Sequence, residues 1–193
     1  MRNKQLLTEQ NVMEDSFRLG VQIFNAGFRP TFIVGLWRGD SNVGIYVQEC
    51  LQTLGINTNH MPIRTSYEGL SACNQTVNNP DRPVRVHGTQ YLLESLNTID
   101  HLLIVDNVFS TGRNVQAVIA KLESRLKRNT PQALKVATLW YKPELRRTER
   151  APDYFQHETD NSLVLPYELD GFSPSELKQH KPSAFERLRD HVN

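Results

Sequence analysis

The stretch His101-Leu-Leu-Ile-Val-Asp-Asn-Val-Phe-Ser-Thr-Gly-Arg-Asn114 decides the fold class of this 193-residue chain. It opens with an apolar, β-branched run that ends in Asp106, a pattern typical of a buried strand. A short loop with Ser110, Thr111 and Gly112 follows, and a helix then begins whose apolar face comprises Val115, Val118, Ile119, Leu122 and Leu126. A strand, a short loop and a helix in this order predict one unit of a parallel α/β sheet.

Helical and extended patterns alternate along the rest of the chain. Apolar residues recur at helical spacing over Thr8–Ala26, with Thr8 as the predicted N-cap and with a predicted buried face of Met13, Phe17, Val21 and Phe24. Further strands are predicted at 31–36, 60–65, 134–140 and 163–166, and further helices at 41–54 and 180–190. This alternation predicts a doubly wound, mainly parallel sheet with helices on both faces.

The length of the chain favours a single domain. We expect a core over about 30–140 and a small hood built from about 1–29 and 141–193. Between 66 and 84 the sequence is polar, contains an Asn-Asn-Pro run and shows little periodicity. A loop of this length in a compact domain is usually a functional lid or is disordered, and we expect a mobile lid over about 66–84.

The charge balance limits the classes of partner. Lys and Arg total 22 and Asp and Glu total 21, so no global basic field attracts nucleic acid or a membrane, and any recognition of phosphate must be local. The N-terminal residues lack the apolar core of a signal peptide, and no apolar run reaches the roughly 18 residues of a membrane helix. Cys50 and Cys73 show no metal-ligand spacing with a histidine. We therefore expect a cytoplasmic protein.

The loop after the central strand has the features of an anion site. Ligands of open parallel sheets bind beyond the carboxyl ends of the strands. Backbone N–H groups of such a loop converge on an anion, and the N-terminus of the next helix adds about half a positive charge. Ser110 and Thr111 can donate hydroxyl hydrogen bonds, and Gly112 allows close approach of the backbone. The alternative is an ordinary strand–turn–helix with an N-cap, and the loop alone does not decide between the two.

This segment resembles the phosphoribosyl pyrophosphate (PRPP) signature of the type I phosphoribosyltransferases, an apolar strand followed by two acids, three variable residues and Thr-Gly. The resemblance implies that Asp106 binds the ribose hydroxyls and a metal ion, with Asn107 at the position of the second acid. It also implies that the loop and the first turn of the helix bind the 5-phosphate, through Ser110, Thr111, Gly112, Arg113 and Asn114.

Two N-terminal segments match the same family in order. Arg38 and Gly39 resemble its pyrophosphate loop, which commonly carries a cis peptide, here between Trp37 and Arg38. Ser66 and Tyr67 resemble the pair that opens the catalytic lid of the hypoxanthine-guanine members. The resemblance thus implies a catalytic set of Asp106, Ser110, Arg38 and Tyr67.

The C-terminal part resembles the purine side of the site in the hypoxanthine and xanthine-guanine branch. Lys142 ends a strand where the family places a lysine on the six-position oxygen of the purine. The resemblance implies that the backbone of Leu163 contacts the base and that Glu168 holds a second metal. Together the matches cover roughly residues 30 to 182.

The resemblance implies transfer of a phosphoribosyl group from PRPP to a 6-oxopurine such as hypoxanthine, guanine or xanthine. Pyrophosphate is released, and Mg²⁺ is the implied cofactor. The implied partners are PRPP, a purine base or nucleotide, and further copies of the chain, because family members are usually dimers or tetramers. The sequence leaves the preferred base, the oligomeric state and the pathway open.

Three positions depart from the family pattern, and all lie in the implied active site. Asn107 replaces the second acid, Ser110 replaces an aspartate proposed as the general acid/base near the purine N7, and Ser162 replaces the aromatic ring that stacks on the base. Loss of an acid/base group typically costs about 10²–10⁴-fold in rate. Tyr167 and Phe155 are the candidates for a replacement ring. Two alternatives therefore stay open: a catalytically degenerate regulatory protein that binds PRPP or a nucleotide, and an enzyme for a non-standard base.

The other polar residues have a structural interpretation. Histidines occur without metal-ligand spacing and are predicted to be surface or loop residues: His60, His87, His101, His157, His180 and His191. The basic group of Arg146, Arg147 and Arg150 is predicted to lie in a solvated loop.

Overall fold

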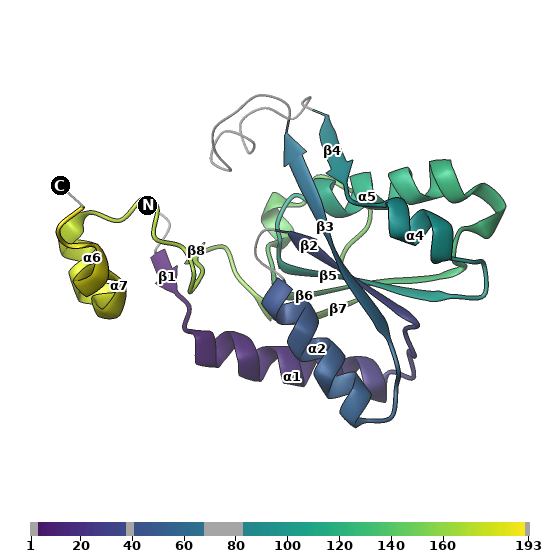
Figure 1. The fold of residues 1–193 in the computed structure, drawn as a ribbon, viewed down its shortest axis with the longest axis horizontal. Helices are drawn as coiled ribbons and strands as arrows, with labels where there is room; N and C mark the ends of the chain where they lie inside the picture. Colours follow the sequence, from purple (N-terminus) through teal and green to yellow (C-terminus); the bar gives the residue numbers. More distant parts are fainter. Residues whose placement is uncertain (1–3, 38–40, 68–82, 192–193) are drawn as a thin grey trace.

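The computed structural model describes residues 4–37, 41–67 and 83–191 (Figure 1). In this part of the chain, the strands of the main sheet follow the order β4 (Val84–His87), β3 (Asn59–Tyr67), β2 (Phe32–Trp37), β5 (His101–Phe109), β6 (Ala133–Tyr141) and β7 (Tyr154–Glu158). Neighbouring strands are parallel except β3 and β4, which are antiparallel. A separate parallel pair joins β1 (Lys4–Leu6) to β8 (Ser162–Val164).

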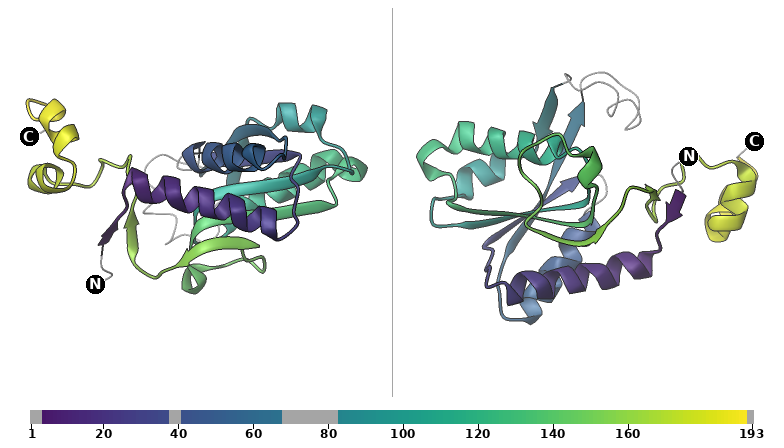
Figure 2. Two further views of the ribbon diagram at one scale, coloured as in Figure 1. Left: turned by 90° about the horizontal axis from the view of Figure 1, so that it is seen from below. Right: turned by 180° about the vertical axis from the view of Figure 1, so that it is seen from behind.

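Helices cover both faces of the main sheet (Figures 1 and 2). One face carries α1 (Glu9–Asn25) and α2 (Ser41–Thr53), and the other carries α4 (Gln90–Ser95) and α5 (Arg113–Leu126). Short 3₁₀ turns follow α5 and β6, at Lys127–Asn129 and Pro143–Leu145. Each face has its own apolar core, which includes Leu19 and Val47 under α1 and α2, and Leu92 and Val118 under α4 and α5.

Two short helices, α6 (Pro174–His180) and α7 (Pro182–Leu188), project from the rest of the molecule beside β1 and β8 (Figure 2). The Lys181 ammonium donates to the Pro166 carbonyl at 2.5 Å. The Lys4 ammonium lies 3.6 Å from the Glu176 carboxylate. These contacts tie the two helices to the small sheet and to the segment that follows it.

The predicted fold class is confirmed, since the structure is a mainly parallel sheet wound on both sides. The α5 helix buries Val115, Val118, Leu122 and Leu126 as predicted. Thr8 is the N-cap of α1, and its hydroxyl oxygen accepts a hydrogen bond from the Asn11 N–H at 3.1 Å.

The predicted buried face of α1 is wrong. Phe17 and Val21 are exposed, at 38% and 42%, while the helix buries Val12, Asp15, Ser16, Leu19, Gly20 and Ile23. The reason is the close approach of α2 at Gly20, where an added Cβ would lie 2.8 Å from the Cys50 Cβ and Sγ atoms. This contact requires glycine at the helix interface and leaves Phe17 to stack edge-on against Tyr46 at the surface.

The structure also divides the predicted hood segments differently. Residues 9–25 form α1 and cover the main sheet, and residues 154–158 form β7 and extend that sheet. The part that stands apart from the sheet consists of β1, β8, α6 and α7 (Figure 1). The predicted C-terminal helix over 180–190 is shorter and begins at Pro182, which fits the first turn of a helix. No helix within the described ranges is long and apolar enough to cross a membrane.

Candidate functional site

The connections of the main sheet reverse direction between β2 and β5. From β2 the chain passes through α2 to β3, and from β5 it passes through α5 to β6 on the opposite side. Ligands of such sheets bind at this point, beyond the carboxyl ends of the two strands. The loop 110–112 after β5 lies there. The segment 38–40 after β2, with the predicted Arg38, Gly39 and cis peptide, lies outside the described residues.

Gly112 closes the loop and starts α5 in a conformation that only glycine adopts readily. Its φ is 77° and its ψ is −5°, in the left-handed region. An added Cβ would lie 2.3 Å from Thr148 Oγ1 and 2.7 Å from Phe109 Cζ. Backbone conformation and space therefore both require glycine at this position.

The loop leaves its amides available for a ligand. Within the described ranges, the N–H groups of Thr111 and Gly112 donate to no protein acceptor. The Arg113 N–H lies 3.4 Å from the Thr111 hydroxyl oxygen, and Arg113 and Asn114 form the half-buried first turn of α5. The positive end of this helix therefore faces the same loop as the amides.

The segment after β6 fixes the other side of the loop. The Lys142 N–H donates to the Phe109 carbonyl at 2.9 Å, and the Arg147 N–H donates to the Thr111 carbonyl at 3.0 Å. Arg146 shapes this segment, because its guanidinium donates to the carbonyls of Thr148 and Glu149 at 2.8 and 2.7 Å. Arg146 is half-buried, so the prediction of a solvated position is wrong for this residue. Arg147 and Arg150 are exposed, as predicted.

Asp106 supplies a carboxylate next to the loop. Burial raises the pKa of Asp106 from 3.8 to about 7, and the backbone N–H groups of Val108 and Asn107 oppose this rise. Near neutral pH the carboxyl is therefore only partly ionised, and a bound cation would favour the charged form. Asn107 is buried at 4% exposure, and its amide avoids placing a second buried charge beside Asp106.

Lys142 connects this side of the sheet to β8. Its side chain is buried, with 8% of the residue exposed, and its ammonium donates to the Asn161 carbonyl at 2.5 Å. Asn161 directly precedes Ser162 and Leu163 in β8. The structure thus brings Lys142 close to the segment that the sequence predicted to contact the base, one strand away from the Ser110–Gly112 loop.

The other predicted residues of the purine side have structural contacts. The Glu168 carboxylate accepts the Leu165 N–H at 2.9 Å and closes the turn that follows β8. Ser162 is exposed. Phe155 packs against Tyr141 in the core, with ring centres 5.4 Å apart, and is not a free stacking surface. Tyr167 is 39% exposed.

The segment predicted to be a lid begins at the end of β3. The Ser66 hydroxyl lies 2.9 Å from His87 Nε2 on the neighbouring strand β4. The backbone of Tyr67 ends β3, and its side chain and residues 68–82 lie outside the described part.

Asp106 is the residue whose chemistry best fits a magnesium ion. Mg²⁺ is commonly held by one or two carboxylates and by the phosphates of its substrate. Among the described residues, no cluster of three His, Cys, Asp or Glu side chains forms a metal cage. Asp106, next to an anion-binding loop, fits an ion that arrives with a phosphorylated substrate.

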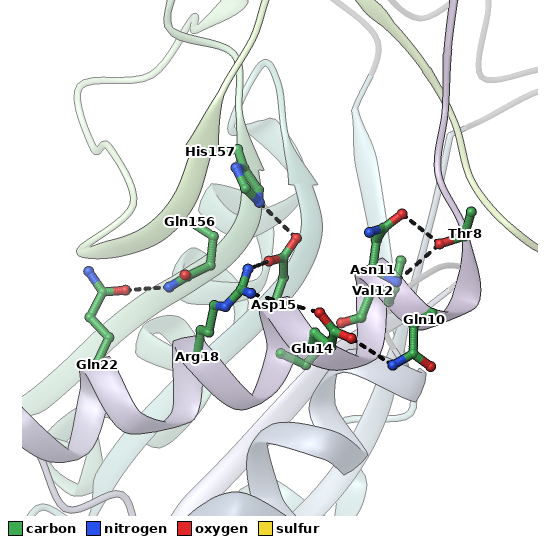
Figure 3. A network of polar contacts seen from close by, with 11 residues as sticks. Thr8, Gln10, Asn11, Val12, Glu14, Asp15, Arg18, Gln22, Gln156 and His157 are labelled. Atoms are coloured by element: carbon green, nitrogen blue, oxygen red, sulfur yellow. Dashed lines mark hydrogen bonds and ion pairs between the residues drawn. The ribbon is translucent and has the colours of Figure 1, made fainter.

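A polar network around the buried Asp15, which the sequence did not predict, joins α1 to β7 (Figure 3). Asp15 is 6% exposed, and its carboxylate accepts from Arg18 at 2.8 Å and lies 2.7 Å from His157 Nε2. His157 also stacks on Trp140 at 4.2 Å between ring centres. His157 lies in strand β7 and not in a loop, and its side chain, 37% exposed as predicted for a surface residue, has a specific partner in Asp15. The available signal was Asp15, a polar residue on the buried face of α1. It was missed because a different face of this helix was predicted to be buried.

The whole arrangement has counterparts among solved structures. A purine phosphoribosyltransferase from Pyrococcus horikoshii superposes with a TM-score of 0.64 at 21% identity, over 88% of this chain and 97% of that one. A hypothetical protein from Neisseria gonorrhoeae, solved with bound ppGpp, has a TM-score of 0.67 at 17% identity, over 98% and 97% of the two chains. This chain has the fold of the type I phosphoribosyltransferases.

Sequence comparison agrees with this type I phosphoribosyltransferase fold over a shorter range. Phosphoribosyltransferase domain-containing protein 1 of Xenopus tropicalis is 34% identical over 70 residues. The matched segment is 36% of this chain and spans 30% of the length of that relative. No protein-family model matches the sequence.

Proposed function

We propose that this protein is a purine phosphoribosyltransferase that transfers the phosphoribosyl group of PRPP to a 6-oxopurine. The observation that carries the proposal is the Ser110–Gly112 loop. It combines a left-handed glycine, amides without a protein acceptor in the described structure and the positive end of α5. Asp106 lies beside it, and PRPP offers a matching 5-phosphate and ribose hydroxyls.

In the proposed reaction, a ring nitrogen of the purine forms a bond to C1 of the ribose. The bond from C1 to the pyrophosphate oxygen breaks, pyrophosphate leaves with the electron pair, and the proton of the purine nitrogen passes to water. Residues 110–114 hold the 5-phosphate through backbone N–H groups and hydroxyls, and Asp106 accepts hydrogen bonds from the ribose hydroxyls. Mg²⁺, when bound with PRPP, would neutralise charge that develops on the pyrophosphate.

Lys142 is proposed to read the six-position oxygen of the base. Its ammonium is positioned by the hydrogen bond to the Asn161 carbonyl, beside the segment that leads into β8. Its backbone N–H donates to the Phe109 carbonyl at the end of β5, which puts Lys142 one strand from the phosphate loop and supports this role. The Leu163 backbone would contact the base from β8.

The remaining roles rest on the resemblance alone. Arg38 and Gly39 are proposed to bind pyrophosphate, and Ser66 and Tyr67 to close over the substrate. The proposed second metal at Glu168 must share that carboxylate with the Leu165 N–H. A homodimer or homotetramer is proposed by analogy with the family.

A second candidate is a regulatory protein that binds a nucleotide or PRPP without turnover. The departures at Asn107, Ser110 and Ser162 favour it, because each removes a group that the family uses in binding or chemistry. The Neisseria protein of similar fold that was solved with bound ppGpp supports this candidate.

One experiment distinguishes the two functions. The protein is incubated with PRPP, Mg²⁺ and each of hypoxanthine, guanine, xanthine and adenine, while pyrophosphate release is followed and binding is measured by calorimetry. Release of pyrophosphate with a 6-oxopurine supports the transferase, and binding without release supports the regulator. The variant Asn107→Asp/Ser110→Asp is the internal comparison, since a gain in rate shows that these positions limit turnover. Absence of both binding and turnover would refute both functions.

A further inference from the structure

Three side chains outside the phosphate loop stand in a row across neighbouring strands. Trp37 of β2 is paired with Arg64 of β3, and Arg64 is paired with His87 of β4. Directly paired residues place their side chains next to each other on one face of a sheet. With Pro62 and Gly88 they line a surface cleft of about 410 Å³, here named the β2–β4 cleft.

All three side chains are exposed. Trp37 is 47% exposed, although a tryptophan of a parallel sheet is normally well covered. Arg64 is exposed and has no ion pair or hydrogen bond with any described residue. His87 is exposed and uses Nε2 for the Ser66 hydroxyl, which leaves Nδ1 for another partner.

The chemistry of the β2–β4 cleft combines a flat aromatic surface with two nitrogen donors. An indole ring stacks well on planar bases. A guanidinium without a carboxylate partner is suited to a phosphate, and an imidazole N–H adds a further donor. The volume lies within the range of small-ligand sites. Inorganic phosphate would use only the donors and a free nucleoside only the ring, whereas a nucleotide uses both.

We propose that the β2–β4 cleft binds a nucleoside monophosphate, with the base on Trp37 and the phosphate between Arg64 and His87. The cleft lies on the β3 and β4 side of β2, and the Ser110–Gly112 loop lies on the β5 side. It is therefore a second nucleotide site, and its existence does not depend on the proposed transferase activity.

The test uses the full chain and titrates GMP, guanosine and inorganic phosphate while tryptophan fluorescence is recorded. Trp37 is the more exposed tryptophan, since Trp140 is 8% exposed, so a ligand in the β2–β4 cleft changes the Trp37 signal. We expect a saturable change with GMP at lower concentrations than with guanosine or phosphate. Arg64→Gln should weaken GMP binding about 10-fold, as expected for loss of one charge-assisted contact. Trp37→Leu should remove the fluorescence change.

Two matched variants separate this site from the phosphate loop. Arg128→Gln removes another exposed arginine, which lies in the 3₁₀ turn after α5 and does not line the cleft, and it should leave the titration unchanged. Asp106→Asn alters the phosphate-loop site and should leave the fluorescence change intact. If Arg64→Gln binds GMP as wild type does, or if Asp106→Asn abolishes the change, the proposal is overturned. The proposal is also overturned if GMP causes no change in tryptophan fluorescence, as would happen if a second copy of the chain covered Trp37 in solution.

Discussion

The protonation of Asp106 makes a counter-intuitive prediction about stability. Replacing this residue by asparagine should stabilise the protein at pH 8 while it damages the proposed site. In the folded state burial raises the pKa of the carboxyl from 3.8 to about 7. The native state therefore holds the proton more tightly than the unfolded chain between these two values. Compared with that of Asp106→Asn, the free energy of unfolding of wild type is therefore highest below pH 3.8, and it falls as the pH rises toward 7.

The magnitude follows from the size of the shift. At about 1.4 kcal/mol per unit, the rise from 3.8 to about 7 corresponds to at most ~4 kcal/mol of lost stability above pH 7. Asp106→Asn removes this loss, because an amide stays neutral at every pH. The variant should thus equal wild type near pH 4 and exceed it at pH 8, by an amount on the order of 2–4 kcal/mol.

The assay is urea unfolding of wild type, Asp106→Asn and Asp160→Asn at pH values from 4.5 to 8.5. Differences between proteins at each pH cancel the titration of the other carboxyl groups. Asp160 is exposed, so its variant should stay within about 0.5 kcal/mol of wild type throughout. A stability difference between Asp106→Asn and wild type that does not grow with pH, or a less stable variant at pH 8, would refute the reasoning.

Three further predictions concern single side chains. Gly112→Ala should lower the free energy of unfolding by at least ~2 kcal/mol and abolish phosphate binding, because its Cβ would meet Thr148 and Phe109. The control is Gly27→Ala, at a φ of 79° with open space around it, which should cost only ~1 kcal/mol in the same denaturation assay. Asp15→Ala should cost about 2 kcal/mol in unfolding measurements, as expected for the loss of hydrogen bonds to a charged group. Adding His157→Gln to it should cost less than His157→Gln does in wild type, because the two residues share one hydrogen bond; full additivity would contradict this. Lys142→Met should weaken binding of inosine monophosphate, the nucleotide of hypoxanthine, about 10-fold in calorimetry and leave the affinity for ribose 5-phosphate unchanged. An equal loss of affinity for both ligands would place Lys142 outside the base site.

The elements that sequence patterns predicted well are those dominated by one strong local signal. The run from Leu102 to Val105 is apolar throughout and lies in the central strand β5. Gly112, predicted for close approach of the backbone, has the positive φ that explains the choice of glycine. In both cases the residue types favour the local conformation that the structure shows, so the conformation could be predicted without knowledge of distant contacts.

The predictions that failed depend on contacts between distant segments. The buried face of α1 follows from the fit of Gly20 against Cys50, thirty residues further along the chain, and the apolar stripe through Phe17 is left at the surface. The same error hid Asp15 as the partner of His157. The place of β7 in the main sheet depends on its pairing with β6, which a short strand pattern does not reveal.

In the candidate site too, the features set by local sequence could be predicted, and those set by contacts between distant segments could not. Asp106 and the loop up to Gly112 are contiguous in sequence, and one motif predicts them together. Lys142 and Asn161 come together only because β6 ends beside the segment that precedes β8. The β2–β4 cleft needs the register of three strands, and the sequence by itself shows no relation between Trp37, Arg64 and His87.

The central claim is that the amides of the loop after β5 hold a phosphate group. It is tested most directly by ¹⁵N NMR of the backbone during titration with ribose 5-phosphate, with ribose as the comparison. The account predicts saturable shifts of the Thr111, Gly112 and Arg113 amides with ribose 5-phosphate and none with ribose. Unshifted loop amides at saturating ribose 5-phosphate would contradict it.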